Sequence, residues 1–375
     1  MVGSAIALDL AETDGFEVTL ADVREDVLQR TQGRVRVKTR QADLSDPSAV
    51  KALAADQDVV LGALPSVLGF QTLRALIEAG KDCCDISFMP ENALELDSLA
   101  KERGVAAVVD CGVAPGLSNL MAGYAVARLR PCARLEIYVG GLPLQRTWPF
   151  EYKAGFAPHD VIEEYVRPAR YVEHGKLVVK EALSEPELLE FPGVGTLEAF
   201  NTDGLRSLAY TLKVPFMREK TLRYPGHIAL MRVFRETGLF SKEPREVGGA
   251  RVRPLDLTAS LLFPKWTFEA GEADLTVLRV IAEGQEGGRK TALVWELLDR
   301  YDPASGLRSM SRTTAYPATI VARLIAAGAV RQKGVLPPEL LGGEPGLLDT
   351  VLSELAKRGV RCSAREIPEA PVREA

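Results

Sequence analysis

Short apolar runs alternate with amphipathic stretches over the first 110 residues. The runs rich in apolar or β-branched residues are predicted strands: VTLA, RVRVKT, DVVLGAL, DCCDI and VAAVVD. The stretches between them are predicted helices over residues 22–30, 45–54, 66–79 and 90–101. Strands that alternate with helices predict a parallel, doubly wound sheet of the α/β class. DVVLGAL is apolar throughout, as expected for a strand covered on both faces.

The pattern changes near Ala133. RLEIYVGGL is a predicted strand, and EYKAGF, ARYVEH, KLVVKEAL and TLEAFN follow it with few helices between them. This order predicts a second, mixed and mainly antiparallel α+β domain. Further on, the pattern predicts helices over 203–209, 225–236, 254–262, 313–326 and 347–357, and a last strand in VRCSAR. Two strand-like runs about a GQEGGR turn predict a long hairpin over residues 273–302.

Composition narrows the class of protein. The 375 residues are 46% hydrophobic and 26% charged, with a net charge of −5, which is typical of a globular protein of two or three domains. There is no basic run for nucleic acid and no apolar stretch that would span a membrane. Five cysteines without a C-x-x-C pair, and three histidines, argue against disulfides and a metal site. We therefore expect a cytoplasmic protein.

The first twenty-two residues have the layout of half a dinucleotide-binding motif. Gly3 opens an apolar helix, a turn and a strand follow, and Asp22 ends that strand. A Rossmann-type unit has its last fingerprint glycine and its ribose-binding acid at this spacing. The first strand and the first two glycines are apparently missing. We expect Met1 to be an internal methionine in a G-x-G-M-V-G context, with the native start upstream.

Asp22 has two compatible interpretations. Its carboxylate can accept hydrogen bonds from the adenosine ribose hydroxyls and would repel a 2′-phosphate, which favours NAD over NADP. Arg24 weakens that preference, because an arginine can receive the phosphate. Alternatively, Asp22 is the N-cap of the helix that follows.

Several loops follow predicted strands at their carboxyl ends, where nucleotide ligands bind in such sheets. Each loop is also consistent with ordinary turn or capping chemistry, so their shared position is the stronger argument. The predicted cofactor-binding residues are therefore Gly3, Asp22, Asp43, Leu44, Ala63, Leu64, Pro65, Asp85, Ser87, Gly112 and Val113.

The segment DCGVAPGLSN from Asp110 to Asn119 is the densest cluster of turn residues. Two glycines and a proline predict an irregular backbone between a strand and a helix. Cys111 is expected to be a buried small residue rather than a nucleophile, because no histidine is near in sequence.

Two later segments combine cations with hydroxyl groups. TLRYPGH places Arg223, Tyr224 and His227 before a helix, and SMSRTTA places Arg312 and Thr313 at another helix start. Arginine suits a bidentate grip on a carboxylate, and histidine suits proton transfer. A structural histidine and a simple helix cap are the alternatives.

Taken in order, these motifs resemble the saccharopine dehydrogenase-like family, and within it L-lysine 6-dehydrogenases. The resemblance covers nearly the whole chain and rests on MVGSAIALDLA, ADLSD, GALPS, DCGVAPGLSN, YVGGLP, EYKAGF, EEYVRPARYVEHGK, EAFNTDGLRSL, TLRYPGH and MSRTTAYPATIVARL. Relatives that act on saccharopine often have G-L-D-P-G where this chain has Ala114, and N-P-L-G-Y-K-F-S-W where it reads WPFEYKAGF. Both differences favour the lysine-type branch.

The resemblance implies an NAD(P)-binding domain over 1–115, a catalytic and dimerisation domain over 116–310, and a C-terminal segment over 311–375 that returns to the first domain. It also implies a homodimer, and NAD-dependent oxidation of the ε-carbon of lysine. That reaction releases ammonia and 2-aminoadipate 6-semialdehyde, which cyclises to piperideine-6-carboxylate.

The chemistry of that reaction assigns roles to the candidates. The amine of lysine has an ordinary pKa near 10.4 and must be neutral to expel a hydride, so the site needs a base or strong desolvation. Asp110 and His227 are the predicted bases. Arg223 and Arg312, with the hydroxyls of Tyr224 and Thr313, are predicted to hold the substrate carboxylate. The alternatives are the same chemistry on saccharopine, or a catalytically silent nucleotide-binding relative.

Overall fold

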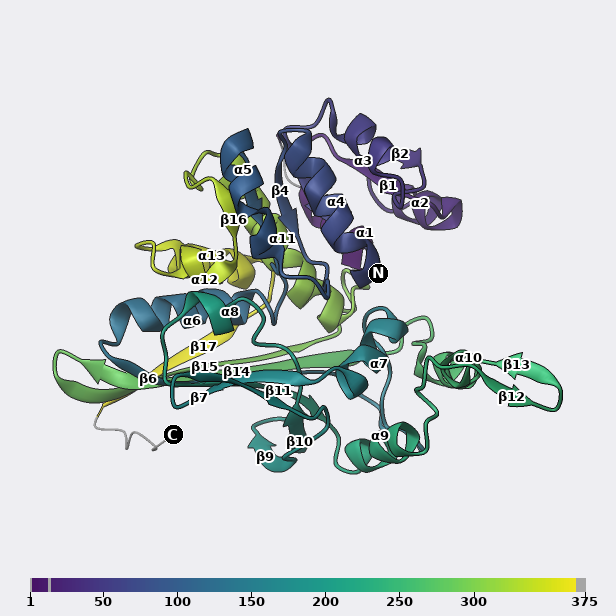
Figure 1. Ribbon diagram of the computed structural model, residues 1–375. Helices are drawn as coiled ribbons and strands as arrows, with labels where there is room; N and C mark the ends of the chain where they lie inside the picture. Colours follow the sequence, from purple (N-terminus) through teal and green to yellow (C-terminus); the bar gives the residue numbers. More distant parts are fainter. Residues whose placement is uncertain (1, 13–14, 369–375) are drawn as a thin grey trace. The chain divides into compact units, whose positions relative to one another are not determined.

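The computed structural model describes residues 2–12 and 15–368. The chain folds into two compact units (Figure 1). Unit 1 comprises residues 1–127 and 311–361, and unit 2 comprises residues 128–310 and 362–375. The boundaries therefore fall after Ala127, Met310 and Arg361, whereas the sequence placed them after residues 115 and 310. Of the segment 311–375 that was expected to return to the first domain, residues 311–361 do so, whereas residues 362–368 pair with the sheet of unit 2.

Unit 1 confirms the predicted alternation of helices and strands. Its strands pair in parallel, in the orders β1–β2 and β16–β5–β4–β3. The strands are β1 (Thr19–Asp22), β2 (Lys38–Gln41), β3 (Val59–Gly62), β4 (Asp82–Asp85), β5 (Ala106–Val108) and β16 (Gly334–Leu336). β16 comes from the C-terminal part of the chain and pairs with β5. The parallel α/β class is therefore correct.

Most helices of unit 1 overlap the expected ranges. The helices are α1 (Val2–Ala11), α2 (Glu25–Gln32), α3 (Pro47–Ala54), α4 (Ser66–Glu78), η1 (Ala93–Leu96), α5 (Asp97–Arg103), α6 (Leu117–Arg128), α11 (Ser309–Ala326), α12 (Pro338–Gly342) and α13 (Leu347–Lys357). Of these, α12 was not predicted and α6 was expected without bounds. A core of buried aliphatic residues joins α4, α5 and strands β3 to β5.

Asp9 of α1 ties the start of the chain to the C-terminal segment. Its carboxylate accepts hydrogen bonds from Thr319 Oγ1 at 2.6 Å, Arg323 Nη1 at 2.7 Å and Arg358 Nε at 2.6 Å. Because these groups come from α11 and the end of α13, the N-terminal helix is held by residues more than 300 positions away.

Unit 2 is built on one nine-stranded mixed sheet in the order β17–β15–β14–β6–β11–β10–β9, with β7 and β8 attached through β11 (Figure 1). Its strands are β6 (Cys132–Pro143), β7 (Ala169–Glu173), β8 (Lys176–Lys180), β9 (Glu187–Phe191), β10 (Gly195–Asn201), β11 (Phe216–Arg223), β14 (Asp274–Glu286), β15 (Arg289–Arg300) and β17 (Cys362–Pro368). All neighbours pair antiparallel except β6 and β11. The predicted long hairpin is β14–β15.

The remaining elements of unit 2 are α7 (Pro158–Val166), α8 (Leu208–Thr211), α9 (His227–Glu236), α10 (Pro254–Trp266) and the small hairpin β12 (Arg245–Val247) to β13 (Ala250–Val252). Three differences from the prediction occur here. The helix expected over residues 203–209 is reduced to α8. EYKAGF forms no strand, because Tyr152 and Ala154 pack into a buried aromatic cluster with α7, α9 and α10. Strand β11 was not predicted, since its sequence FMREKTLR carries four charges.

Candidate functional site

In unit 1, the carboxyl ends of β3, β4 and β5 converge on Asp85. This buried carboxylate accepts the backbone N–H of Ser87 at 2.7 Å and the hydroxyl of Ser87 at 3.2 Å. The Asp85 carbonyl accepts the backbone N–H of Cys111 at 3.0 Å. A side chain at Gly62 would overlap the Asp85 carboxylate. Asp85 and Ser87 therefore shape the strand ends, whatever they contact in a ligand complex.

Gly3 lies against the loop that follows β3. A Cβ atom at Gly3 would be 3.7 Å from the Cβ of Ala63. Ala63 and Pro65 are exposed, and Leu64 is half-buried. The structure therefore brings two of the predicted cofactor-binding segments, far apart in sequence, to one place at the start of α1.

Asp22 ends β1 and is half-buried. Its Oδ1 accepts the backbone N–H of Arg24 at 2.8 Å, and α2 begins only at Glu25, so Asp22 is not the N-cap of that helix. The Arg24 guanidinium binds Asp26 through Nε at 3.1 Å and Nη2 at 2.7 Å. Arg24 is thus near Asp22 but already has an acidic partner.

Asp43 makes a local turn after β2. Its Oδ1 accepts the backbone N–H of Ser45 at 2.9 Å and the Ser45 hydroxyl at 2.6 Å. The N-cap of α3 is Asp46, which accepts the backbone N–H of Ser48 at 2.8 Å. Leu44 packs against the core of unit 1.

The segment from Asp110 to Gly116 is a tight, buried loop. Gly112 N–H donates to the Pro115 carbonyl at 3.0 Å, and the Gly112 carbonyl accepts from Leu117 at 2.9 Å. Gly116 has a φ of +137°, and a Cβ there would overlap the Gly112 backbone. Asp110 has a φ of +52°, which L residues adopt rarely. Val113 is buried in the same loop.

In unit 2, Arg223 lies at the end of β11 inside an aromatic cluster. Its Nη2 donates to Glu164 Oε2 at 2.7 Å and to the Tyr152 hydroxyl at 3.4 Å, and its guanidinium lies 4.4 Å from the centre of the Tyr152 ring. Arg223 Nε has no hydrogen-bond partner, although the residue is only 2% exposed. A buried donor without a hydrogen-bond partner is costly, so Arg223 Nε is a candidate to receive an acceptor from a ligand.

His227 opens α9 in the same cluster, with both ring nitrogens engaged. Nδ1 lies 2.9 Å from the Phe150 carbonyl, and Nε2 lies 2.9 Å from the Tyr165 hydroxyl. These partners require that Nδ1 carries the proton and that Nε2 accepts. Burial, together with the nearby positive charge of Arg223, lowers the pKa of His227 to about 3. A neutral imidazole with two filled nitrogens suits positioning of Tyr165 better than proton transfer.

Tyr224 is separated from Arg223 although the two are adjacent in sequence. Its hydroxyl donates to the Pro143 carbonyl at 2.9 Å, and its ring packs with the aliphatic cluster of the sheet. Arg146 lies 4.7 Å above that ring. Arg223 and Tyr224 therefore do not form one carboxylate site.

Arg312 and Thr313 belong to unit 1 and lie near the start of α11. Arg312 Nη2 donates to the Arg358 carbonyl at 3.1 Å, and Thr313 is buried. Of the predicted substrate and catalytic residues, the structure places Arg223 and His227 in one cluster, whereas Asp110, Arg312 and Thr313 stand in the other unit. Their roles stay predictions.

A row of polar side chains on β11 was missed by sequence reasoning. Because side chains alternate along a strand, Glu219, Thr221 and Arg223 share one side of β11. Glu219 Oε2 accepts the hydroxyl of Thr202 at 2.6 Å, and the Thr202 and Thr221 hydroxyls lie 2.8 Å apart. The alternation of side chains in residues 216–223 is the sequence signal that indicates this row.

Glu219 differs from Glu136 and Asp203, the two buried carboxylates of unit 2 that pair with arginines. It is 3% exposed, and among residues 2–12 and 15–368 no lysine, arginine or histidine pairs with it. Burial, with the nearby negative charges of Glu164 and Asp203, raises the pKa of Glu219 to about 8, against the hydrogen bonds from Thr202 and the Gly204 amide. The carboxyl group is therefore held neutral at pH 7.

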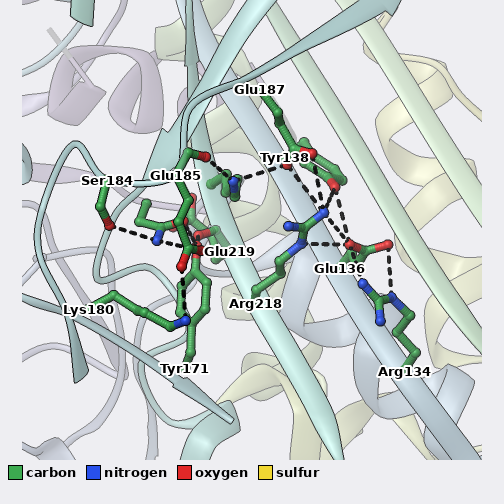
Figure 2. A network of polar contacts seen from close by, with 12 residues as sticks. Arg134, Glu136, Tyr138, Tyr171, Lys180, Ser184, Glu185, Glu187, Arg218 and Glu219 are labelled. Carbon is green, nitrogen blue, oxygen red and sulfur yellow. Dashed lines mark hydrogen bonds and ion pairs between the residues drawn. The ribbon is translucent and has the colours of Figure 1, made fainter. Parts of the chain in front are cut away.

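The opposite side of β11 carries a closed charge network (Figure 2). Glu136 of β6, which is fully buried, is flanked by Arg134 and by Arg218, whose Nε donates to Glu136 Oε1 at 2.6 Å. Arg218 Nη2 donates to the Tyr138 hydroxyl at 2.6 Å, and Lys220 lies 3.1 Å from Glu187. Each charge in this network has an opposite partner.

Two kinds of site are not observed in the part of the chain that the structure describes. No group of three or more histidine, cysteine, aspartate or glutamate side chains is arranged to hold a metal ion there. Within the same residues, no helix is long and apolar enough to cross a membrane.

Two family models match the chain. Residues 1–108 match the model of the saccharopine dehydrogenase NADP binding domain, and residues 112–360 match that of the saccharopine dehydrogenase C-terminal domain. The fold is similar to apo saccharopine dehydrogenase (L-Glu forming) from Saccharomyces cerevisiae, with a TM-score of 0.79 and 18% identity over 98% of this chain and 97% of that chain.

Curated relatives are distant in sequence. The saccharopine dehydrogenase [NADP(+), L-glutamate-forming] of Schizosaccharomyces pombe is 23% identical, over 87% of this chain and 88% of that protein. The mitochondrial alpha-aminoadipic semialdehyde synthase of Mus musculus is 26% identical over 62% of this chain, which spans only 27% of that longer protein. Carboxyaminopropylagmatine dehydrogenase from Synechocystis is 21% identical over 92% of both chains. The family models cover nearly the whole length, and the chain belongs to the saccharopine dehydrogenase family of NAD(P)-binding oxidoreductases.

Proposed function

We propose that this protein oxidises the terminal C–N bond of L-lysine with NAD(P). Lysine, water and the oxidised cofactor would yield 2-aminoadipate 6-semialdehyde, ammonia, a proton and the reduced cofactor, and the semialdehyde would cyclise to piperideine-6-carboxylate. Oxidoreductase chemistry is common to the family. The choice of lysine is our proposal, and it depends on the charges of unit 2.

The charges along one side of β11 carry the proposal. On its side of β11, Arg223 is the only cation in a row that otherwise holds Glu219 and Thr221. Arg218 and Lys220 lie on the other side and are already paired with Glu136 and Glu187. Saccharopine brings more carboxylates than lysine and needs more cationic partners. One arginine beside a carboxyl group matches a diamino acid with a single carboxylate.

Arg223 is the proposed anchor for that carboxylate. Its Nε is buried without a partner, and its planar guanidinium can present a second N–H beside it. The Arg223–Glu164 and Arg223–Tyr152 contacts hold the guanidinium in place before a ligand arrives. Fixing the substrate at one end orients its reacting carbon, and such orientation accounts for much of the rate gain in a reaction of two substrates.

The residues of unit 1 fit an adenine dinucleotide. Asp22 at the end of β1 would bind the ribose, the amides at the start of α1 would face the pyrophosphate, and the exposed loop 63–65 would border it. When bound, the cofactor supplies the hydride acceptor. Asp22 favours NAD, and the pairing of Arg24 with Asp26 leaves that arginine less available for a 2′-phosphate.

Saccharopine is the second candidate substrate. Relatives named as saccharopine dehydrogenases match this chain over most of its length, which favours this alternative. The test is formation of reduced cofactor, followed by absorbance, with lysine or saccharopine and with NAD or NADP. We expect lysine with NAD to be the fastest pair. Turnover of saccharopine but not lysine would replace the proposal with the alternative.

Cofactor binding has its own test, which does not depend on the substrate. NAD or NADP at 100 times its Kd should stabilise the folded protein by about 2.7 kcal/mol, seen as a rise in Tm. Absence of a shift with both cofactors would contradict the dehydrogenase proposal and favour a catalytically silent relative.

The carboxylate anchor is tested by Arg223→Ala and Arg223→Lys. Both variants should raise the KM for lysine about tenfold or more, because a buried charge-assisted hydrogen bond to the carboxylate is lost or misplaced. The matched control is Arg253→Ala, since Arg253 is exposed and pairs with Asp256 on the surface. An unchanged KM in both Arg223 variants would remove Arg223 from the site.

A further inference from the structure

A buried carboxyl group without a cation is the most unusual feature of unit 2. Glu219 has as hydrogen-bonding partners the Thr202 hydroxyl and the Gly204 amide, and its neighbouring charges, Glu164 and Asp203, are also acidic. Burial of an unpaired carboxylate is costly. The group therefore either stays protonated or receives a cation from outside the chain.

The other buried acids show how this protein normally satisfies such groups. Glu136 is flanked by Arg134 and Arg218, and Asp203 binds Arg170 at 2.7 Å. Asp274 accepts two backbone N–H groups at the start of α11, from Ser309 at 2.7 Å and Met310 at 3.0 Å. In the described residues Glu219 has no cation partner, and its hydrogen-bonding partners are one hydroxyl, from Thr202, and one backbone amide, from Gly204. Arg218 and Lys220 are its immediate neighbours in sequence but pair elsewhere.

Glu219 lies on the same strand as Arg223, at a distance that can be compared with the length of a substrate. Glu219 and Arg223 are four residues apart on the same side of one strand, so their Cα atoms are about 13 Å apart. Thr221 lies between them and shares a hydroxyl contact with Thr202. The row thus presents a carboxyl group, hydroxyls and a guanidinium in sequence along β11.

We propose that Glu219 binds the side-chain ammonium group of the substrate, while Arg223 binds its carboxylate. This inference rests on the proposed function, because it concerns the same ligand. Glu219 is then the residue that selects amino acids with a distal amine over neutral analogues of equal length. Its carboxyl group, neutral in the free protein, loses its proton to solvent when the ammonium arrives.

The space around Glu219 is set by its neighbours. A Cβ at Gly204 would overlap the Glu219 carboxylate, so that backbone closes one side. The hydroxyl oxygen of Tyr171 on β7 lies 2.7 Å from the Glu219 carbonyl oxygen and 2.5 Å from Asn201 Oδ1, so its contact is with the backbone of the strand and not with the Glu219 carboxyl group. The carboxylate is therefore positioned by packing and by Thr202, independently of any ion pair.

Binding of two matched ligands tests this role by calorimetry. The ligands are lysine and the analogue in which a hydroxyl replaces the ε-amino group. Wild-type protein should bind lysine about tenfold or more tightly than the analogue, because a charge-assisted hydrogen bond is lost. In Glu219→Gln the preference should nearly disappear, and in Glu219→Asp part of it should remain. Glu190→Gln, an exposed change on β9, is the matched control and should keep the full preference.

Proton release is the readout that a merely structural role would not change. Titrations in buffers of different ionisation enthalpy should show about one proton released per lysine bound near pH 7 by the wild type. Glu219→Gln should release none, and Glu190→Gln should behave as the wild type.

The outcomes separate this inference from the proposed function. Lysine oxidation with unchanged preference and proton release in Glu219→Gln would overturn the role of Glu219 alone. Lysine binding with Glu219-dependent preference, but without oxidation, would support this role and overturn the proposed reaction. Failure of the wild type to bind lysine would overturn both.

Discussion

The two sides of strand β11 treat buried charge in opposite ways. On one side, Arg218 and Lys220 complete a network in which Glu136 and Glu187 balance them (Figure 2). On the other side, Glu219 has no cation within the described residues, and Arg223 Nε has no acceptor. Both sides are built from the eight residues of one strand.

We infer that the charged residues on one side of β11 stabilise the fold, whereas those on the other side bind a ligand. A closed network satisfies its members internally, so removing one member leaves the others buried and unpaired. In the open row Glu219 has hydrogen bonds but no cation, and Arg223 pairs with Glu164 while its Nε has no acceptor, so part of this row is left for a ligand to satisfy. Substitutions on the two sides should therefore have effects of opposite sign on stability.

The largest effect is expected for Glu136→Gln. The change leaves Arg134 and Arg218 without their buried anion and should lower the free energy of unfolding by about 3–5 kcal/mol. Chemical denaturation followed by tryptophan fluorescence measures this directly, because all three tryptophans, Trp148, Trp266 and Trp295, belong to unit 2. A loss below about 1 kcal/mol would mean that the network is not structurally important.

Gly204→Ala should have the next largest effect. The new methyl group would overlap the Glu219 carboxylate, and the resulting strain should cost about 1–3 kcal/mol of unfolding free energy. The displaced carboxylate should also reduce the preference for lysine over its hydroxyl analogue. A variant with full stability and full preference would show that the Glu219 side chain is not confined as described.

His227, which lies in the same cluster as Arg223, should make the stability of the protein depend on pH in the acid range. The unfolded chain binds a proton at His227 below pH 6.5, whereas the folded protein does so only near pH 3. Stability present above pH 6.5 is therefore lost as the pH falls toward 3, by at most about 1.4 kcal/mol per pH unit from this group. In His227→Gln this slope should be smaller. His159 and His174 are exposed, and His159→Gln should leave the slope unchanged.

Glu219→Gln should change stability at pH 7 with the opposite sign. The folded protein keeps the Glu219 proton up to a pH of about 8, whereas the unfolded chain loses it near 4.5. Wild-type stability should therefore fall as the pH rises from 4.5 to 8, and the variant should lack this fall. Comparison of unfolding midpoints at pH 5 and pH 8 measures it. Destabilisation of the variant at pH 8 would show that Glu219 is internally paired.

Much of the fold was predictable because it depends on local pattern. Apolar strands and amphipathic helices in unit 1 follow periods of 2 and 3.6 residues, and these periods are set by backbone geometry alone. The hairpin β14–β15 was equally clear, with two alternating runs about a glycine-containing turn. β11 was missed because charges at 218, 219 and 220 do not resemble a buried strand until partners on both sides are known.

The site was predictable only in part, for the same reason. Arg223 and His227 were singled out together because a short turn brings them close in sequence and in space. Glu164, Thr202 and Glu219 were not recognised, since α7, the loop after β10 and β11 must first assemble around them. Tyr224 was grouped with Arg223, yet strand alternation sends it to the other side.

The sequence by itself determined the family, the parallel and mixed sheets, and the position of a dinucleotide-binding unit. Ordered motifs and periodic patterns can be recognised without knowledge of which residues are in contact. Only the tertiary structure decided which charges are neutralised. In the sequence, a glutamate or an arginine of the closed network cannot be distinguished from one of the open row. Their pKa values and their capacity to bind a ligand depend on burial and on partners brought from distant parts of the chain.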